Sequence, residues 1–408
     1  MSPGAAVIGA GASGLAAALR AAGIPGGVTV LEGNAKPGKK LLATGNGRCN
    51  LTNEVISPEH YHGDVRFAAP VLNAWPAARV RRAFLRLGLL TRADGQGRVY
   101  PNSLQAASVA EALLSACREQ EISIECGCPV ERILPVKGGF LLFAGGGERF
   151  VRRCVLACGA KASPKHSTGS GYELARSLGH TVTPLAPSLT GFRTLDKLPR
   201  ALKGVRCKAR AALCREGREL YGESGEVIFG ENSISGICVM NLSARVRELG
   251  EKGLSLRLDL LEDFSREEVA AYLRDFCGSH PGRRAGELFS GALPSRLGWE
   301  LVRRMDWNPE RRLWELSPKE LEHAARRAKA FSIPVSLSPD WEQAQCTAGG
   351  VPLNEIDPET MESRICPGLY LTGELLDLDG DCGGYNLHWA WATGFTAGEA
   401  IGKEMGAG

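Results

Sequence analysis

The apolar positions at the start of the chain predict a strand, a helix and a second strand in close succession. Residues 5–8 form a short apolar run, residues 15–23 (LAAALRAAG) have helical composition, and residues 28–32 (VTVLE) form another apolar run. Short apolar runs bounded by glycines are typical of buried strands, and a glycine after an apolar helical stretch is a common stop signal. We therefore expect a βαβ unit at the beginning of the sequence.

The apolar pattern changes twice along the rest of the chain. Helical stretches over residues 68–88, broken at Pro76, and 104–120 precede a strand-rich stretch over 122–159. From about residue 187, short strands separated by glycine turns indicate a small barrel or sandwich, and residues 265–330 then indicate three helices. Residues 331–338 return to strand and residues 387–405 form a last helix, while no tandem repeat is visible.

The bulk composition is that of an ordinary globular protein. The chain has 408 residues, of which 44% are hydrophobic and 23% charged, which is enough for a sizeable core. No run approaches the roughly 20 apolar residues that span a bilayer, and the N-terminus lacks the pattern of a signal peptide, so we expect a cytoplasmic protein. The thirteen cysteines include no CxxC pair, which favours reduced, mostly buried thiols and no metal site.

The positive charge is concentrated in one segment. Residues 281–331 hold nine Arg and two Lys against seven acidic residues, an excess equal to the net charge of +4. The two signs are interspersed, which favours a solvated helical face over a nucleic-acid surface. A nucleic-acid partner is therefore not the first expectation, and the oligomeric state stays open.

The first candidate for chemistry is a GxGxxG motif between the first strand and the first helix. Gly9 permits the tight turn, Gly11 lets the backbone approach a pyrophosphate, and Gly14 lets the helix pack on the strand. Glu32 lies 18 residues after Gly14, at the end of the second strand, where it can accept a hydrogen bond from a ribose hydroxyl. An acidic residue there argues against a 2′-phosphate on this nucleotide.

Two glycine-rich loops favour FAD over NAD. One loop, TGNGRCNLTN, covers residues 44–53, and the other, LYLTGELLDLDGDCGGYN, covers residues 369–386. A flavin has a ribitol and a ring system that need such additional loops. Gly373-Glu374 end a strand, where an acid can hold the ribitol, and Gly383-Gly384 start the last helix, whose N-terminus favours negative charge on a reduced flavin.

Together these motifs resemble a known family. The stretches KKLLATGNGRCNLTN, VLACGA…STGSGYELARSLGH, PLAPSL, TAGGV…TMES and GLYLTGELLDLDGDCGGYNLHWAWATG cover nearly the whole chain in the same order. They resemble the BaiN-like, or aminoacetone-oxidase-like, family of bacterial NAD(P)/FAD-dependent oxidoreductases. The resemblance implies an α/β fold with a two-part Rossmann-like FAD-binding domain (1–186 and 346–408). It also implies an inserted β-barrel (187–262 and 331–345) and a small helical domain (263–330).

The resemblance also implies that the loop with Arg48, Cys49 and Asn50 lies against the cofactor. The residues expected to bind FAD are Gly9, Gly11, Ala12, Ser13, Gly14, Glu32, Gly33, Lys40, Thr44, Gly45, Gly47, Arg48, Cys49, Asn50, Val130, Ala157, Cys158, Gly159, Gly373, Glu374, Asp381, Gly383, Gly384, Tyr385 and Asn386. The chain departs from the family pattern at a few positions. Asn46 and Ala160 stand where the family often has glycine, His388 where it has glutamine, and Ile237 where it has proline.

The reacting side chains are not fixed by the motifs. Tyr385 and His388, at the start of the last helix, are candidate proton donors, although a packed, hydrogen-bonded histidine is the stronger interpretation of His388. Cys49 has no partner cysteine nearby, which favours a polar-loop role over a redox role. Gly169 and Gly171 follow no strand, so we expect one dinucleotide domain, and NAD(P)H would act as a transient reductant at the substrate's side of the flavin.

These observations predict an FAD-dependent oxidoreductase that transfers hydride between flavin N5 and a small organic substrate. An NAD(P)H-linked reductase is favoured over an oxidase, and the resemblance allows either C=C reduction of a steroid-like enone or amine oxidation. The alternative is a flavin-containing RNA-binding or RNA-modifying protein that uses the Arg-rich helices.

Overall fold

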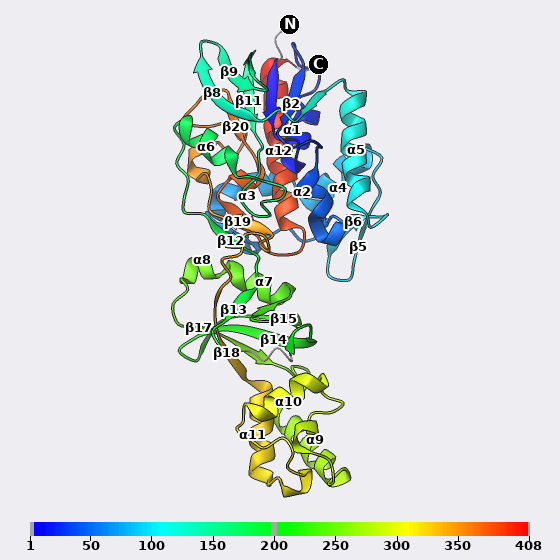
Figure 1. Ribbon diagram of the computed structural model, residues 1–408. Helices are drawn as coiled ribbons and strands as arrows, with labels where there is room; N and C mark the ends of the chain where they lie inside the picture. Colours follow the sequence, from blue (N-terminus) through cyan, green and yellow to red (C-terminus); the bar gives the residue numbers. More distant parts are fainter. Residues whose placement is uncertain (1–3, 197–201, 407–408) are drawn as a thin grey trace. The chain divides into compact units, whose positions relative to one another are not determined.

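The computed structural model describes residues 4–196 and 202–406 (Figure 1). The chain divides into two compact units. Unit 1 comprises the residues up to 188 and those from 340 on, and unit 2 comprises residues 189–339. Unit 2 is therefore an insertion in the chain of unit 1. Within the described ranges, no helix is both long and apolar enough to cross a membrane.

A five-stranded sheet forms the centre of unit 1. Its order is β20 (Leu369–Leu371), β11 (Arg153–Leu156), β1 (Ala5–Ile8), β2 (Val28–Glu32) and β7 (Ser123–Cys126), and all neighbours are parallel. The βαβ unit expected at the start of the chain is present as β1, α1 (Ala12–Ala21) and β2. Because parallel strands end at the same edge of a sheet, the loops after β1, β2, β11 and β20 meet there.

Helix α12 (Tyr385–Met405) packs against α1 at unusually close range (Figure 1). A Cβ at Gly394 would lie 2.3 Å from the carbonyl oxygen of Ser13, and one at Gly398 would lie 2.3 Å from that of Ala17. Only glycine allows two helix backbones to approach in this way. The close packing brings the last helix of the chain to the carboxyl edge of the sheet.

The remaining elements of unit 1 surround this centre. The helical stretch predicted over 68–88, with its break at Pro76, is two helices, α3 (Val65–Ala74) and α4 (Ala77–Arg86), because Pro76 interrupts the helix between them. The others are α2 (Lys39–Ala43), η1 (Thr44–Gly47), β3 (Thr52–Asn53), η2 (Pro58–His60), β4 (Tyr61–Gly63), β5 (Thr91–Ala93), β6 (Arg98–Pro101), α5 (Ala106–Glu119), β8 (Val130–Val136), β9 (Gly139–Ala144), β10 (Gly147–Val151), α6 (Ser170–Ser177), β12 (Ala186–Ser188), β19 (Cys346–Ala348), η6 (Leu353–Glu355), η7 (Gly373–Leu375) and β21 (Leu378–Gly380).

Unit 2 contains a closed barrel, in the order β13-β16-β15-β14-β17-β18. The strands are β13 (Phe192–Thr194), β14 (Arg206–Arg215), β15 (Arg218–Phe229), β16 (Ser233–Ser235), β17 (Leu254–Asp259) and β18 (Phe331–Leu337), with α7 (Ile237–Ala244) and α8 (Val246–Leu249) beside them. In β17, the buried Leu254, Leu256 and Leu258 alternate with less buried residues, as expected for a strand with one face in the barrel core. Of the two architectures expected from the sequence, a barrel or a sandwich, the structure shows the barrel.

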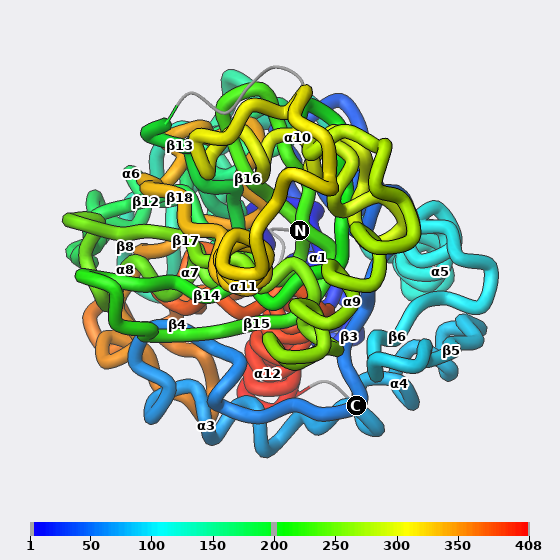
Figure 2. Tube along the Cα trace, turned by 90° about the horizontal axis from the view of Figure 1, so that it is seen from below, coloured from blue at the N-terminus to red at the C-terminus, as the bar shows by residue number. Residues whose placement is uncertain are grey.

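Three helices complete unit 2: α9 (Arg266–Ser279), α10 (Ser295–Arg303) and α11 (Pro318–Lys329) (Figure 2). Two short segments between them, 281–288 and 309–316, share the pattern P-x-R-R-x-x-E-L, a repeat not recognised from the sequence. The amide of Ala285 donates to the carbonyl of Arg311 (2.6 Å), and that of Leu313 donates to the carbonyl of Arg283 (2.9 Å). The two segments therefore pair reciprocally, and each leads into a single turn, η4 (Ala285–Glu287) or η5 (Leu313–Glu315).

Candidate functional site

A cavity of about 820 Å³ lies at the carboxyl edge of the unit 1 sheet. Its walls come from the loops after β1, β2, β11 and β20, from the first turns of α1 and α12, and from α2, α6, β8 and β19. Of the residues predicted to bind FAD, those that line it are Gly9, Gly11, Ala12, Ser13, Glu32, Gly33, Lys40, Thr44, Val130, Ala157, Cys158, Gly159, Glu374 and Asn386. In the strand order, the cavity extends from β2 across β1 and β11 to β20.

The three motif glycines have three different environments. A Cβ at Gly14 would lie 1.9 Å from the carbonyl oxygen of Gly9, so this glycine is required by helix–strand packing. Gly9 has φ +106 and no room for a Cβ beside Ala157. A Cβ at Gly11 would meet no protein atom within 4 Å, because this position faces the cavity. The space at Gly11 fits a ligand that approaches the backbone closely, as a pyrophosphate does.

The N-terminus of α1 is free to bind an anion. Its N-cap residue is Gly11, no side chain caps the helix, and the first turn contains no acidic residue. The first N–H groups of a helix have no intrahelical partner, and the helix dipole favours negative charge there. The geometry therefore fits the phosphate groups of FAD.

Glu32 fixes the turn beside this helix. Its carboxylate accepts hydrogen bonds from the amides of Ala10 (2.7 Å) and Asn34 (2.7 Å) and from the Asn34 side chain (2.8 Å). A carboxylate has about four acceptor positions, so one remains for a ribose hydroxyl. Glu32 thus both braces the glycine loop and suits the nucleotide half of FAD.

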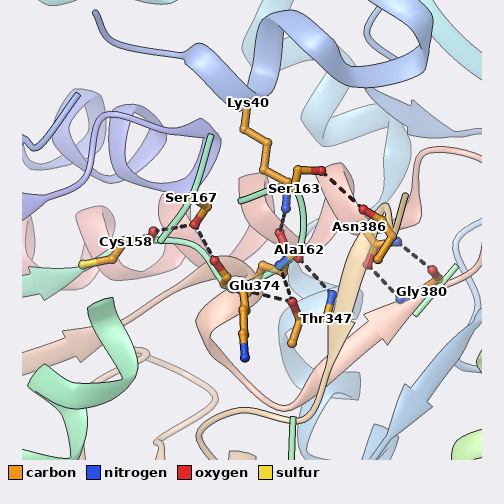
Figure 3. A network of polar contacts seen from close by, with 12 residues as sticks. Lys40, Cys158, Ala162, Ser163, Ser167, Thr347, Glu374, Gly380 and Asn386 are labelled. Carbon is orange, nitrogen blue, oxygen red and sulfur yellow. Dashed lines mark hydrogen bonds and ion pairs between the residues drawn. The ribbon is translucent and has the colours of Figure 1, made fainter. Parts of the chain in front are cut away.

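The opposite side of the cavity is held by contacts between segments far apart in the sequence (Figure 3). The Lys40 ammonium group forms an ion pair with Glu374 (2.5 Å), and the other Glu374 oxygen accepts from the amide of Thr347 (3.0 Å). The Asn386 side chain bonds both the amide (2.9 Å) and the carbonyl (2.6 Å) of Gly380. These contacts join α2, β19, η7, β21 and α12 around the cavity.

The remaining predicted residues lie outside the cavity wall. They are Gly14, Gly45, Gly47, Arg48, Cys49, Asn50, Gly373, Asp381, Gly383, Gly384 and Tyr385. Arg48 is exposed to solvent, whereas Cys49 is buried and burial raises the pKa of its thiol to about 12. A thiol with this pKa stays protonated near neutral pH, which supports a packing role for Cys49 rather than a redox role.

The structure explains two features of the glycine-rich loop. Asn46 has φ +55, in the left-handed region where asparagine is tolerated better than other side chains, so it can replace the glycine common in the family. The Oδ1 atom of Asn50 is buried and has no hydrogen-bond partner among residues 4–196 and 202–406. A Cβ at Gly384 would lie only 2.8 Å from this atom, so the loop and the N-terminus of α12 are in direct contact.

His388 is a buried structural residue. Its side chain is inaccessible to solvent and its Nδ1 lies 2.8 Å from the hydroxyl of Thr52. Burial lowers the pKa of His388 to about 4, so the ring is neutral near pH 7. These surroundings favour the packed histidine that the sequence suggested over a proton donor.

Sequence reasoning missed several polar residues around the cavity. His166 and Gln345 line it, Thr347 holds Glu374, and His60 and His62 both contact Asp381. The spacing of the two histidines, with one residue between them, was the only local signal, and it is a weak one because His60 ends the 3-10 helix η2 whereas His62 lies in strand β4.

Comparison with known proteins places this arrangement in a family. The HI0933-like protein Rossmann domain model matches residues 3–400. The chain belongs to this family. One relative, the 3-dehydro-bile acid delta(4,6)-reductase of Clostridium scindens, is 40% identical over 97% of this chain and 98% of its own length. Another, the ribosomal RNA dihydrouridine synthase of Escherichia coli, is 25% identical over 97% of both chains.

The family membership confirms the resemblance found in the sequence. The fold of this HI0933-like protein is shared with the 3-ketosteroid delta1-dehydrogenase of Sterolibacterium denitrificans, with a TM-score of 0.52 and 13% identity over 98% of this chain and 99% of that chain. The Rossmann-like unit with its cavity, together with the family, identifies an FAD-dependent oxidoreductase.

Proposed function

We propose that this HI0933-like protein reduces a ring C=C bond that is conjugated to a carbonyl group. The names of the two relatives support this chemistry, since a delta(4,6)-reductase and a dihydrouridine synthase both saturate such a bond. The observation that carries the proposal is the 40% identity to the bile-acid reductase over nearly the full length of both chains. It favours a steroid-like enone as the substrate and a reductase over an oxidase.

The residues of unit 1 have distinct tasks in this proposal. When bound, FAD supplies the hydride for the reduction. The N-terminus of α1 and Gly11 would hold the pyrophosphate, and Glu32 would hold the ribose of the AMP half. The ion pair of Lys40 with Glu374 would hold the ribitol side. The N-terminus of α12, which has no capping side chain and no acid in its first turn, would favour negative charge on the ring.

NAD(P)H is the reductant in this proposal, and the cytoplasm is the location. The chain has one dinucleotide-type motif, so the nicotinamide would act at the flavin and then leave. All thirteen cysteines are free thiols, several of them buried, which suits a reducing compartment.

RNA is the second candidate substrate. Two relatives that are 25% and 26% identical over almost the whole chain are named as ribosomal RNA dihydrouridine synthases. In unit 2, the exposed Trp314 lies next to exposed arginines, a combination that suits base stacking with phosphate contacts. Positive and negative side chains are mixed in this segment, however. Arg284 forms ion pairs with Glu287 (3.3 Å) and Glu310 (3.5 Å). This pairing reduces the positive potential that would attract RNA phosphates, so RNA is the less favoured candidate substrate.

Rapid mixing of the purified yellow protein tests both candidates. The flavin is first reduced with NADH or NADPH, and the reduced protein is then mixed with androst-4-ene-3,17-dione or with unmodified ribosomal RNA. We expect rapid flavin reoxidation by the steroid and a product heavier by two hydrogens in mass spectrometry. Reoxidation by RNA alone, with dihydrouridine formed, would favour the second candidate. Reoxidation by neither probe, but by oxygen with an amine as reductant, would contradict C=C reduction.

A further inference from the structure

A histidine–aspartate–histidine cluster lies beside the β20 side of the cavity. Strand β4 pairs antiparallel with β21, so that His62 lies opposite Asp379 and Tyr61 opposite Gly380. Asp381 follows β21 directly, and its amide donates to the carbonyl of His60 (2.9 Å). The carboxylate of Asp381 then contacts both imidazoles, Nδ1 of His60 at 3.2 Å and Nε2 of His62 at 2.8 Å.

The cluster lies beside two elements that line the cavity, β21 and α12. Leu378, at the start of β21, lines the cavity, and so does Asn386, which is bonded to Gly380. The ring of His60 stacks on Tyr385, the residue before Asn386, with a centroid distance of 4.4 Å. His60, His62 and Asp381 do not line the cavity themselves, but His60 contacts Tyr385, the neighbour of the lining residue Asn386.

His60 differs from His62 in accessibility. The side chain of His60 is 32% exposed, whereas that of His62 is fully buried and that of Asp381 is 7% exposed. Asp381 fixes the Nδ1 side of the His60 ring, and Nε2 of His60 has no hydrogen-bond partner within residues 4–196 and 202–406. A carboxylate on one imidazole nitrogen orients the ring and leaves the other nitrogen to act as an acid.

We propose that His60 is the proton donor for C=C reduction, and that Asp381 and His62 are its positioning residues. This inference rests on the proposed function. Hydride from reduced FAD adds to the β-carbon of the enone and forms a C–H bond. The C=C π bond breaks, and its electron pair moves to the α-carbon. The Nε2 proton of the His60 imidazolium then forms the second C–H bond, and the neutral imidazole regains a proton from solvent.

Tyr61 and His180 are less suited to this step. Burial, followed by the charges of Tyr385 and Asp381, raises the pKa of Tyr61 well above its usual value, so its phenol is a poor acid. Tyr61 also donates to the carbonyl of Tyr385 (3.2 Å). His180 forms a comparable chain with Glu355 (2.7 Å) and Ser363 (2.8 Å), but its side chain is fully buried and both its ring nitrogens have partners.

Reduction of the flavin and its reoxidation by the enone can be measured separately, which distinguishes proton donation to the substrate from the chemistry of the flavin itself. The purified holoprotein and the variants His60→Gln, Asp381→Asn and Tyr385→Phe are reduced with dithionite and mixed with androst-4-ene-3,17-dione in rapid-mixing experiments. His323→Gln, a half-buried histidine of unit 2, is the matched control. Reduction by dithionite needs no proton donor to a carbon atom, whereas reoxidation by the enone does. Flavin content, melting temperature and recovery in imidazole buffer are measured on the same preparations.

We expect His60→Gln to keep its flavin, its melting temperature and its rate of reduction, and to be reoxidised at least 100-fold more slowly, the usual range for loss of a general acid. Imidazole should restore part of the rate, and Asp381→Asn should slow the same step. The role of His60 would be overturned if reduced His60→Gln were reoxidised by the enone at the wild-type rate. It would also be overturned if reoxidation were lost in Tyr385→Phe alone. Failure of the wild-type protein to react with any enone would overturn the proposed function itself.

Discussion

The two sides of the cavity are built in different ways. On the β2 side, the glycine motif, the uncapped α1 and Glu32 come from one stretch of about 25 residues, and Glu32 ties that stretch together through the amide of Ala10. On the β20 side, the wall comes from α2, β19, η7, β21 and α12, and the pair of Lys40 with Glu374 joins residues more than 300 positions apart. The first side is a local motif, and the second depends on the whole of unit 1 being folded.

This contrast suggests that the two sides respond to different changes. On the β2 side, a ligand would lie directly against the backbone. This side should therefore be sensitive to any atom added where the backbone faces the cavity. The β20 side contains buried carboxylates and imidazoles, so it is sensitive to protonation. Four changes test this difference, from the largest expected effect to the smallest.

The largest effect is expected for Gly11→Val. The added side chain meets no protein atom at its Cβ but projects into the cavity, so we expect a folded protein that has lost essentially all of its flavin. Absorbance at the flavin band and the melting temperature measure the two properties separately. Gly278→Val, at an exposed position in α9 that also has open space, is the matched control and should keep its flavin. Full flavin content in Gly11→Val would show that the phosphates bind elsewhere.

Acid should destabilise the β20 side through His388. Its pKa is about 4 when folded and about 6.5 when unfolded, so the unfolded state binds the proton more readily. This contribution to stability is therefore fully present above pH 6.5 and is lost as the pH falls towards 4. The loss corresponds to about 3 kcal/mol in the free energy of unfolding. Urea unfolding between pH 7 and 4 should show a smaller decrease in His388→Gln, the residue common in the family, than in the wild type. Equal decreases would mean that His388 is not held neutral.

More of the fold than of the candidate site could be predicted from the sequence. The βαβ unit, the two-helix break at Pro76 and the inserted barrel follow from local patterns and from the family resemblance. The places of Gly11 and Glu32 beside the cavity could be predicted for the same reason, because they depend on neighbours within one motif. His60 and His62 could not, because they gain a meaning only when β4 pairs with β21 and brings them to Asp381.

A similar limit applies to the helical part of unit 2. The paired segments 281–288 and 309–316 are identical at only five of eight positions. Their relation becomes visible in the reciprocal backbone bonds that join Ala285 to Arg311 and Leu313 to Arg283. Side-chain patterns predict elements, whereas pairing through backbone groups leaves little trace in the sequence.

An intermediate effect is expected for Glu32→Gln. The glutamine amide nitrogen is a donor and cannot accept from the N–H groups of Ala10 and Asn34, so at least one carboxylate bond is lost. A hydrogen bond to a charged group contributes about 1.5–3 kcal/mol, which corresponds to about a 10- to 150-fold weaker retention of flavin. Titration of the apoprotein with FAD gives the dissociation constant. Glu125→Gln on the adjacent strand β7 is the control, and an equal weakening in both variants would contradict the role of Glu32.

The smallest effect is expected for Arg48→Ala. The family resemblance places this loop against the cofactor, whereas the structure shows the Arg48 side chain exposed and outside the cavity wall. An exposed charge contributes about 0–1 kcal/mol to an ionic contact, so the dissociation constant for FAD should rise by no more than about 5-fold. Because solvent-exposed charges are screened, the effect should fall further when the ionic strength is raised. Arg303→Ala, at an exposed position on α10, is the control and should leave FAD binding unchanged. A loss of FAD binding in Arg48→Ala as large as in Glu32→Gln would show that the loop closes over the cofactor when FAD binds, and that the β20 side, like the β2 side, holds it through a local motif.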